Sequence, residues 1–254
     1  MDAETPDSPT IERITCLNVP LDILFPEQIP AVINQMILKG GEQHIVLLSL
    51  RDLLRARKAG EYRNYVLSAA LVIPISKSII GGVRFLTGKT LQRYMPFDFV
   101  IRLLSTLEER GRTVYLLGGR RKSIQTTERN LKRTFPGLRV VGRCAGGFRH
   151  TDEANIFQAI KKAGPALLLV NRGVPGDERW IGRNSGAFGP GIRLWCSDLF
   201  DVFAERRHRP SKGVFDRGLE WIGFLAKNPL RIFRIFPYLY YKILLVYHRL
   251  FRGG

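Results

Sequence analysis

The sequence has few cysteines and no long uncharged apolar run, and each of these absences argues against certain classes of protein. Its three cysteines, Cys16, Cys144 and Cys196, are an odd number, lie far apart and form no CxxC pair. This pattern indicates a reducing compartment and argues against a disulfide framework or a zinc site. No window of about 20 residues is free of charge, which disfavours a transmembrane span. The stretch 1–12 begins acidic and rich in proline, unlike a signal peptide, and predicts a disordered leader.

Motifs for cofactors, metals and covalent catalysis are absent as well. The sequence contains neither GxGxxG nor a P-loop lysine, and no serine or cysteine nucleophile motif. Its four histidines, His44, His150, His208 and His248, are far apart and lack metal-ligand spacing. We therefore expect no cofactor and no metal ion, and we interpret each histidine as a surface or core residue.

Acidic residues are scarce in two stretches, which together carry the whole net charge of +18. Residues 110–149 hold eleven Lys or Arg against one acid, a net charge of +10. Residues 202–254 hold eleven against three, a net charge of +8. Such concentration indicates anionic partners, namely phosphates, an anionic membrane surface or nucleic acid.

Strand and helix patterns alternate with short glycine turns, which predicts an α/β fold with a Rossmann-like, doubly wound, mainly parallel sheet. We expect this core over residues 13–204, and a basic amphipathic helical appendage over 205–254 that associates with a membrane. The expected strands are Ile14–Leu17 and Leu21–Leu24 (a hairpin around Asn18–Pro20), His44–Leu48, Leu71–Pro74, Thr113–Leu117, Leu138–Val141, Leu167–Val170 and Gly191–Cys196. The expected helices are Pro26–Leu38 (or a residue or two later, because of Pro30), Arg51–Lys58, Ser76–Leu86, Phe97–Glu109, Lys122–Thr134, Asp152–Lys162 and a short one from Asp198.

The stretch Ala166–Trp180 predicts a buried strand, a glycine turn and a helix opened by Pro175. Asp177 and Glu178 would then lie in the first helical turn, where the helix dipole favours acids. Ligands of open α/β sheets bind at the carboxyl ends of strands. Asn171, Arg172, Asp177 and Glu178 are therefore candidate binding residues, although a well-capped helix after a core strand explains the same spacing equally well.

A second candidate is the turn Gly118–Gly119, which follows an expected strand and precedes Arg120–Lys122. Glycines allow the backbone to approach a ligand, and a basic helix N-terminus suits a phosphate. A tight strand-to-helix turn accounts for the two glycines as well.

The C-terminal tail combines a basic and an aromatic-rich apolar face. Asn228–Pro229 is typical of a helix start, and Pro237 is expected to break the helix into two pieces. Five cations fall within about 80° of arc at 100° per residue: Arg231, Arg234, Lys242, Arg249 and Arg252. The adjoining side gathers Ile232, Ile235, Phe236, Leu239, Ile243, Val246, Tyr247 and Leu250. This pattern predicts a helix lying in a membrane interface, with packing on the domain or on a partner as the alternative.

A series of motifs in a fixed order resembles the WecG/TagA/CpsF glycosyltransferases over about residues 14–236. The matching segments are Leu17–Asp22, Arg93 followed by Asp98, Val114–Gly119, Phe135–Gly142, Gly147–Phe148, Gly173–Pro175, Glu178–Ile181, Phe200–Asp201, Gly218–Trp221 and Asn228–Arg231.

The resemblance implies transfer of N-acetylmannosamine or a related sugar from a UDP-sugar to a polyprenyl-diphosphate-linked acceptor. The reaction would occur on the cytoplasmic side of the cell membrane, to which the protein is peripherally bound, in envelope or extracellular polysaccharide assembly. A homo-oligomer or another glycan-assembly protein is a further expected partner. Arginines of the family's appendage help to close the active site, and Arg209, Arg231 and Arg234 are the nearest counterparts here.

The sequence departs from the family pattern at the chemistry. The family's proposed catalytic aspartate falls on Ile75, and its Thr-x-Asn sugar motif falls on Leu47 and Ser49. In the loop after Asn171, a neutral amide is replaced by Asp177, whereas Arg93, the glycine turns and Glu178 persist. A general base contributes typically 10²–10⁴-fold, so its loss together with the sugar-site residues favours an impaired or non-catalytic member.

The alternative is an active glycosyltransferase with a relocated base, for which Asp177 is the candidate, assisted by Arg93. A nucleic-acid-binding protein is disfavoured, because the basic tail is interleaved with apolar residues at helical spacing and no DNA or RNA motif is present.

Overall fold

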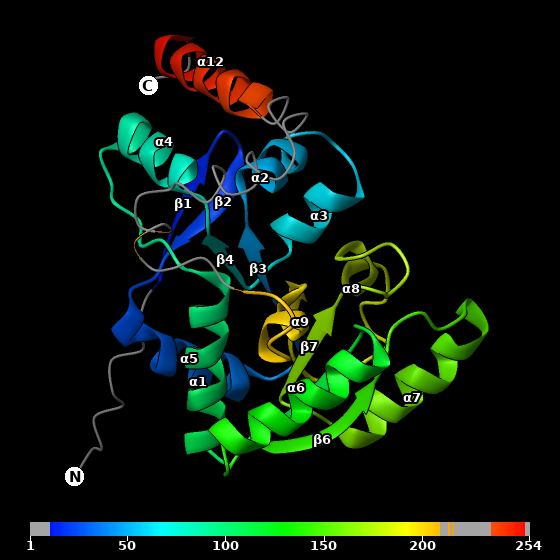
Figure 1. The fold of residues 1–254 in the computed structure, drawn as a ribbon. Helices are drawn as coiled ribbons and strands as arrows, with labels where there is room; N and C mark the ends of the chain where they lie inside the picture. Colours follow the sequence, from blue (N-terminus) through cyan, green and yellow to red (C-terminus); the bar gives the residue numbers. More distant parts are fainter. Residues whose placement is uncertain (1–10, 209–212, 214, 216–234, 252–254) are drawn as a thin grey trace.

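The structure is a computed structural model that describes residues 11–208, 213, 215 and 235–251. A six-stranded parallel sheet in the order β4-β3-β8-β7-β5-β6 forms its centre (Figure 1). Its strands are β3 (Glu42–Leu48), β4 (Leu71–Pro74), β5 (Thr113–Leu117), β6 (Arg139–Cys144), β7 (Leu167–Asn171) and β8 (Gly191–Ser197). Every pairing in this sheet is parallel, which confirms the predicted doubly wound α/β fold.

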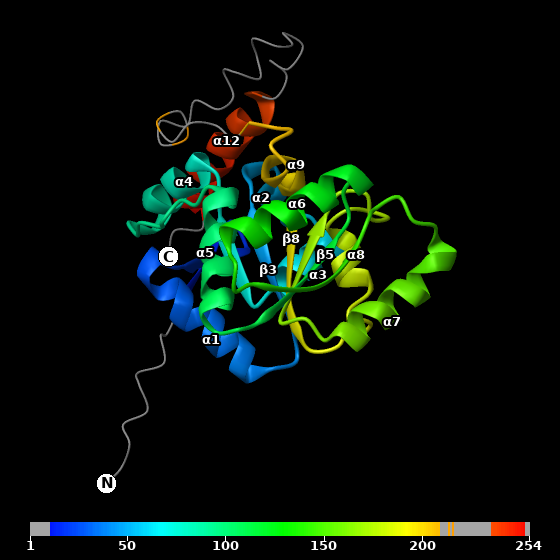
Figure 2. The same ribbon diagram turned by 60° about the horizontal axis from the view of Figure 1, so that its bottom comes forward.

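Helices follow the strands and cover both faces of the sheet (Figures 1 and 2). One face carries α1 (Ile29–Lys39), α5 (Pro96–Glu109), α6 (Arg121–Thr134) and α9 (Leu199–Phe203). The other carries α2 (Leu50–Ala56), α3 (Glu61–Leu67), α4 (Lys77–Thr87), α7 (Glu153–Ala163) and α8 (Arg179–Arg183). Two 3-10 turns, η1 (Pro26–Gln28) and η2 (His150–Asp152), precede α1 and α7.

Strand β7 shows why a short apolar run becomes a fully buried strand here. Side chains alternate between the faces of a sheet with a period of two. Leu167 and Leu169 pack into the core under α1, α5 and α6, whereas Leu168 and Val170 pack into the core under α2, α7 and α8. All four are at most 2% exposed, so both faces of the strand require apolar residues.

The hairpin forms as predicted, with a shifted turn. β1 (Glu12–Cys16) and β2 (Val19–Ile23) are antiparallel and separated by Leu17 and Asn18 alone. Both of these residues have positive φ, 50° and 65°, as a two-residue hairpin turn of the right twist requires. Pro20, expected in the turn, instead lies inside β2.

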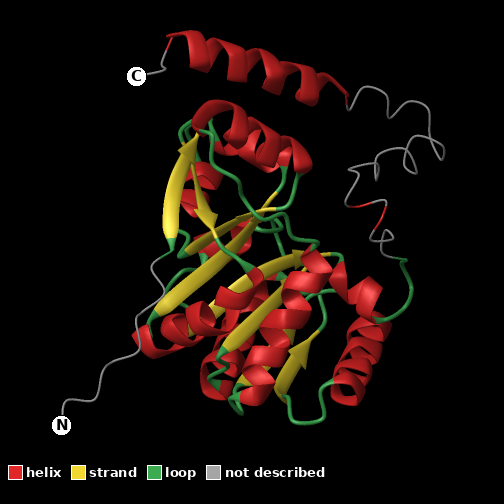
Figure 3. Cartoon of the chain, turned by 90° about the vertical axis from the view of Figure 1, so that its left-hand side faces the viewer, coloured by secondary structure: helices red, strands yellow, loops and turns green. Residues whose placement is uncertain are grey.

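The C-terminal helix α12 (Ile235–Phe251) packs on α4 and α2 at one end of the molecule (Figure 3). Tyr241 and Leu245 are buried against the core, and Tyr241 Oη lies 3.8 Å from Cys16 Sγ. The Tyr241 ring passes directly over Gly82 of α4, where a Cβ would come within 2.0 Å of Tyr241 Oη. Pro237 stands in the first turn of α12, which suits proline, and the expected piece of helix before Ile235 lies outside the described residues.

One expectation about a helix is wrong, and one helix was not expected. The helix predicted to begin at Pro175 begins at Arg179, for reasons given below. Helix α3 was not predicted, and it follows Gly60, whose φ of 141° separates it from α2. The leader before residue 11 and the start at Asn228–Pro229 lie outside the described residues, and the division at residue 204 stays a prediction.

Candidate functional site

The carboxyl ends of the parallel strands define the candidate site. The chain leaves β5 toward β6 but leaves β7 toward β8, so β5 and β7 are neighbours whose connections run in opposite directions. Ligands of open α/β sheets bind at such a switch point. Gly118–Gly119 follow β5 and Asn171–Arg172 end β7, so the structure brings these predicted residues together.

Gly118 is required because the β5 and β7 loops touch. A Cβ on Gly118 would lie 2.4 Å from the carbonyl oxygen of Asn171. The N–H groups of Gly118 and Gly119 donate to Cys144 O at 2.9 Å and Arg172 O at 2.6 Å. Those N–H groups are therefore used within the protein. An anion bound at this turn would therefore contact the N–H groups in the first turn of α6 and the exposed side chains of Arg120 and Arg121.

Asn171 and Arg172 differ in their surroundings. Asn171 is buried, and its Oδ1 accepts a hydrogen bond from Arg172 N at 2.6 Å, at a bulge in the pairing of β7 with β8. Arg172 is exposed and donates Nε–H to Ser197 Oγ at 3.1 Å. Asn171 thus shapes the end of the strand, and Arg172 places a cation over the switch point.

The loop after β7 is a left-handed turn rather than the start of a helix. Gly176 and Asp177 have φ values of 80° and 54°, and Asp177 N donates to Val174 O at 3.3 Å. Consecutive residues with positive φ cannot continue a right-handed helix, which is why α8 begins only at Arg179. Asp177 is exposed, and its carboxylate has no hydrogen-bond or ion-pair partner among the described residues. The predicted dipole stabilisation of Asp177 by a first helical turn is therefore wrong.

Glu178 is the acid of this loop that the fold holds in place. It precedes α8, and its Oε1 lies 2.5 Å from the guanidinium of Arg55 on α2. Arg55 in turn lies over the ring of Tyr62 at 4.1 Å. Trp180 of α8 is 1% exposed and donates Nε1–H to Glu153, which anchors the loop from the other side.

Helix α2 contributes a carboxylate that the sequence analysis missed, Asp52. Ser49 caps α2 directly after β3, and its hydroxyl and N–H both donate to Asp52 Oδ2. Burial, followed by the charge of Glu178, raises the pKa of Asp52, while the Ser49 hydrogen bonds and Arg55 oppose this change. The spacing Ser-x-x-Asp after an apolar strand was the available signal, but it is common to many helix starts.

The end of β4 brings Ile75 and Arg93 together. Arg93 donates Nε–H to the carbonyl oxygen of Ile75 at 3.0 Å. Its guanidinium also lies 3.7 Å from the ring centroid of Phe215, and it donates to the Phe215 carbonyl. Arg93 is therefore adjacent to the strand end where the family pattern places its aspartate.

The apolar residues of α12 form an exposed stripe. They lie at helical spacing and each is at least 50% exposed: Phe236, Leu239, Ile243, Val246, Tyr247 and Leu250. Lys242 is exposed beside them, whereas Arg249 turns toward α4, donates to Phe85 O at 2.7 Å and lies over the Phe85 ring. The side chain of Ile235 and the predicted residues Arg209, Arg231, Arg234 and Arg252 lie outside the described residues.

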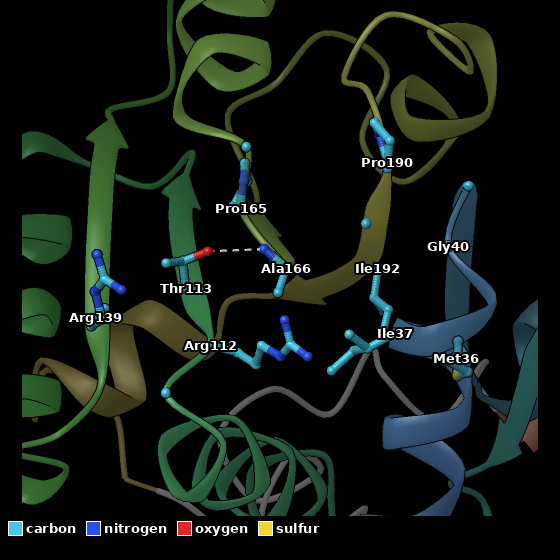
Figure 4. A pocket seen from close by; sticks show the side chains of 14 residues that line it. Met36, Ile37, Gly40, Arg112, Thr113, Arg139, Pro165, Ala166, Pro190 and Ile192 are labelled. Carbon is cyan, nitrogen blue, oxygen red and sulfur yellow. Dashed lines mark hydrogen bonds between the residues drawn. The ribbon is translucent and has the colours of Figure 1, made fainter.

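A separate hollow of about 350 Å³ lies at the opposite edge of the sheet, where the strands begin (Figure 4). Five of its fourteen lining residues are glycines at the ends of helices and strands, and Arg112 lies in its centre with Arg139 at its side. None of the predicted site residues lines it. In the described parts of the chain, no cluster of three metal-binding side chains occurs, and no helix is long and apolar enough to cross a membrane.

The fold and the site define the class: an α/β protein with a charged site at the carboxyl edge of a doubly wound parallel sheet. The profile of the Glycosyl transferase WecG/TagA/CpsF family matches residues 14–253, and the chain belongs to this family.

Two relatives carry the same name, N-acetylglucosaminyldiphosphoundecaprenol N-acetyl-beta-D-mannosaminyltransferase. The protein of Bacillus spizizenii (strain ATCC 23059 / NRRL B-14472 / W23) is 27% identical over 67% of this chain, and the match spans 65% of the relative's own length. The protein of Bacillus subtilis (strain 168) is 22% identical over 69% of this chain and 68% of its own.

Proposed function

We propose that this protein transfers an N-acetylmannosamine-like sugar from a UDP-sugar to a polyprenyl-diphosphate-linked acceptor in cell-envelope polysaccharide synthesis. The family and the names of both relatives support this substrate class. The observation that carries the proposal is that Arg93, Arg172, Glu178 and Asp52 all lie at the carboxyl edge of the sheet. Arginines of this kind suit the diphosphates of donor and acceptor, and carboxylates suit proton transfer.

A second candidate function is binding of these substrates without transfer. It is favoured by Ile75, which cannot accept a proton at the strand end where the family pattern has an aspartate. The sequence alone favours this impaired form. Asp52 lies beside that strand end and can accept a proton, which favours transfer over binding alone.

Incubating the purified full chain with UDP-sugar and polyprenyl-diphosphate-linked N-acetylglucosamine in vesicles tests transfer, with UDP release and the lipid product as readouts. Turnover that disappears in Arg93→Ala supports transfer. Saturable UDP-sugar binding without product in the wild type supports binding alone.

We also propose that α12 lies in the cytoplasmic surface of the cell membrane. Its exposed stripe runs the length of the helix beside Lys242, as in interfacial helices. Helix α2, which carries Asp52 and Arg55, contacts α12, so the site and the membrane helix are on adjoining elements. A lipid-linked acceptor would then reach the site without leaving the bilayer surface.

Flotation with anionic vesicles tests the membrane location. Each buried Leu or Ile contributes about 1.5–3 kcal/mol, so Leu239→Ser with Ile243→Ser lowers vesicle binding more than tenfold. Leu38→Ser is the control, because Leu38 is 72% exposed and belongs to α1, which lies at the other end of the molecule from α12 (Figure 1). Equal binding of both variants would refute the location. Salt-dependent DNA binding without flotation would favour a nucleic-acid partner, and a larger solution mass that the α12 variants reduce would favour a homo-oligomer.

A further inference from the structure

Asp52 is positioned so that one of its carboxylate oxygens is held and the other is available. Oδ2 accepts hydrogen bonds from the hydroxyl and N–H of Ser49. Oδ1 accepts no hydrogen bond from the described residues. Since it is not among the fully buried side-chain atoms without a partner, it is open to solvent. Asp52 therefore has a fixed orientation and a free oxygen.

The position of Asp52 is tied to the strand end that lacks a base. β3 and β4 are adjacent, and Ile75 N donates to Leu48 O at 3.0 Å. The first turn of α2 is joined to the same place, because Leu50 N donates to Ser76 Oγ at 2.9 Å. Asp52 and Ile75 thus lie on neighbouring segments that hydrogen bonds hold together at the carboxyl edge.

The surroundings of Asp52 make its carboxylate more basic than an exposed one. Burial is the largest cause of its raised pKa, and the charge of Glu178 adds to it. A general base is most effective when its pKa approaches the working pH. Asp177, the candidate from the sequence, is exposed and has no hydrogen-bond partner among the described residues.

We propose that Asp52 is the general base of this chain, acting in place of the aspartate that Ile75 replaces. The inference rests on the proposed transfer function. The acceptor hydroxyl attacks C1 of the donor sugar, and the bond between C1 and the β-phosphate oxygen breaks, with UDP leaving as the electron-pair acceptor. The hydroxyl proton passes to Asp52 Oδ1 and then to water.

Asp52→Asn is expected to keep the fold, so a loss of activity in this variant would not arise from a loss of structure. The capping box needs only an oxygen that accepts from Ser49, and an asparagine Oδ1 supplies one. Replacing a buried carboxylate by a neutral amide also removes its desolvation cost. The variant is therefore expected to fold and to melt at the same or a higher temperature than the wild type.

The test measures kcat/KM against pH for the wild type, Asp52→Asn and Glu178→Gln, with Glu109→Gln as the control. Glu109 ends α5 at the opposite edge of the sheet and is exposed. We expect Asp52→Asn to lower kcat/KM by about 10²–10⁴-fold and to abolish the acid limb of the profile. Glu178→Gln should move that limb to lower pH, since it removes a charge that raises the pKa of Asp52. Glu109→Gln should change neither.

Two results separate failure of this inference from failure of the proposed function. The role of Asp52 is overturned, and the transfer function is not, if the wild type turns over and Asp52→Asn retains that rate within threefold. The same holds if the acid limb disappears in Asp177→Asn instead. Donor binding by the wild type without any product overturns both.

Discussion

Replacing Gly82 by alanine should separate α12 from the core, and its neighbour provides a matched control. A Cβ at residue 82 would lie 2.0 Å from Tyr241 Oη, 2.8 Å from Tyr241 Cζ and 3.1 Å from Leu245 Cδ1. Gly81 belongs to the same helix, and a Cβ there would meet nothing within 4 Å. The two substitutions therefore add the same atom to the same helix, and only one of them collides with α12.

The magnitude follows from what Tyr241 loses. Overpacking a core costs about 1–3 kcal/mol when neighbours shift. Complete expulsion of the tyrosine ring loses an aromatic burial of about 150–250 Å², or roughly 4–6 kcal/mol at 25 cal/mol per Å² as an upper bound. Gly81→Ala should instead stabilise the protein by about 0.5–1 kcal/mol, because alanine favours the helix.

Urea denaturation and limited proteolysis measure these effects. We expect Gly82→Ala to lower the free energy of unfolding by at least about 1 kcal/mol and to speed cleavage within 235–251, while Gly81→Ala does neither. Adding Tyr241→Phe to Gly82→Ala should recover part of the loss, since the hydroxyl is the nearest obstacle. Similar unfolding curves for Gly81→Ala and Gly82→Ala would refute the packing of Tyr241 over α4.

Two further predictions concern buried polar groups on the hairpin and on β3. Asp22 is 3% exposed, receives both Nε–H and Nη2–H of Arg13 at 2.7 and 2.9 Å, and accepts from Val72 N at 2.6 Å. Asp22→Ala should cost about 3–5 kcal/mol in urea denaturation, and a loss below 1 kcal/mol would contradict this docking of the hairpin. His44 is half-buried and stacked on Tyr65, and burial lowers its pKa. The unfolded chain then binds the proton first, so stability is full above about pH 6.5 and falls at lower pH by up to about 1.4 kcal/mol per pH unit. The excess loss between pH 7.5 and 5 should vanish in His44→Gln, and an unchanged slope would contradict it.

The sheet was predictable from the sequence because its signals are local. Runs such as Leu167–Val170 and Thr113–Leu117 have the length and apolar content of a strand that is buried on both faces of the sheet. Glycines follow both runs. The helix expected at Pro175 failed because two left-handed residues, Gly176 and Asp177, stand between the proline and α8. The sequence shows that a proline can begin a helix but does not show the φ of the residue that follows.

The site was predictable only in part. Gly118, Gly119, Asn171 and Arg172 could be placed at one sheet edge, because parallel strands align their carboxyl ends. Asp52 could not be recognised as a site residue, because its role depends on three segments that are distant in sequence and meet beside Ile75. A Ser-x-x-Asp helix start is common, and only the tertiary structure brings this aspartate near the charge of Glu178.

The pH dependence of sugar transfer by Asp52→Asn, compared with the wild type, is the decisive measurement of whether Asp52 is the general base. We expect product formation by the wild type, with a fall in kcat/KM at acid pH. We expect Asp52→Asn to lower kcat/KM by about 10²–10⁴-fold and to show no acid limb, with a melting temperature at or above that of the wild type. An Asp52→Asn variant that transfers sugar at the wild-type rate with the same pH profile would contradict this role of Asp52.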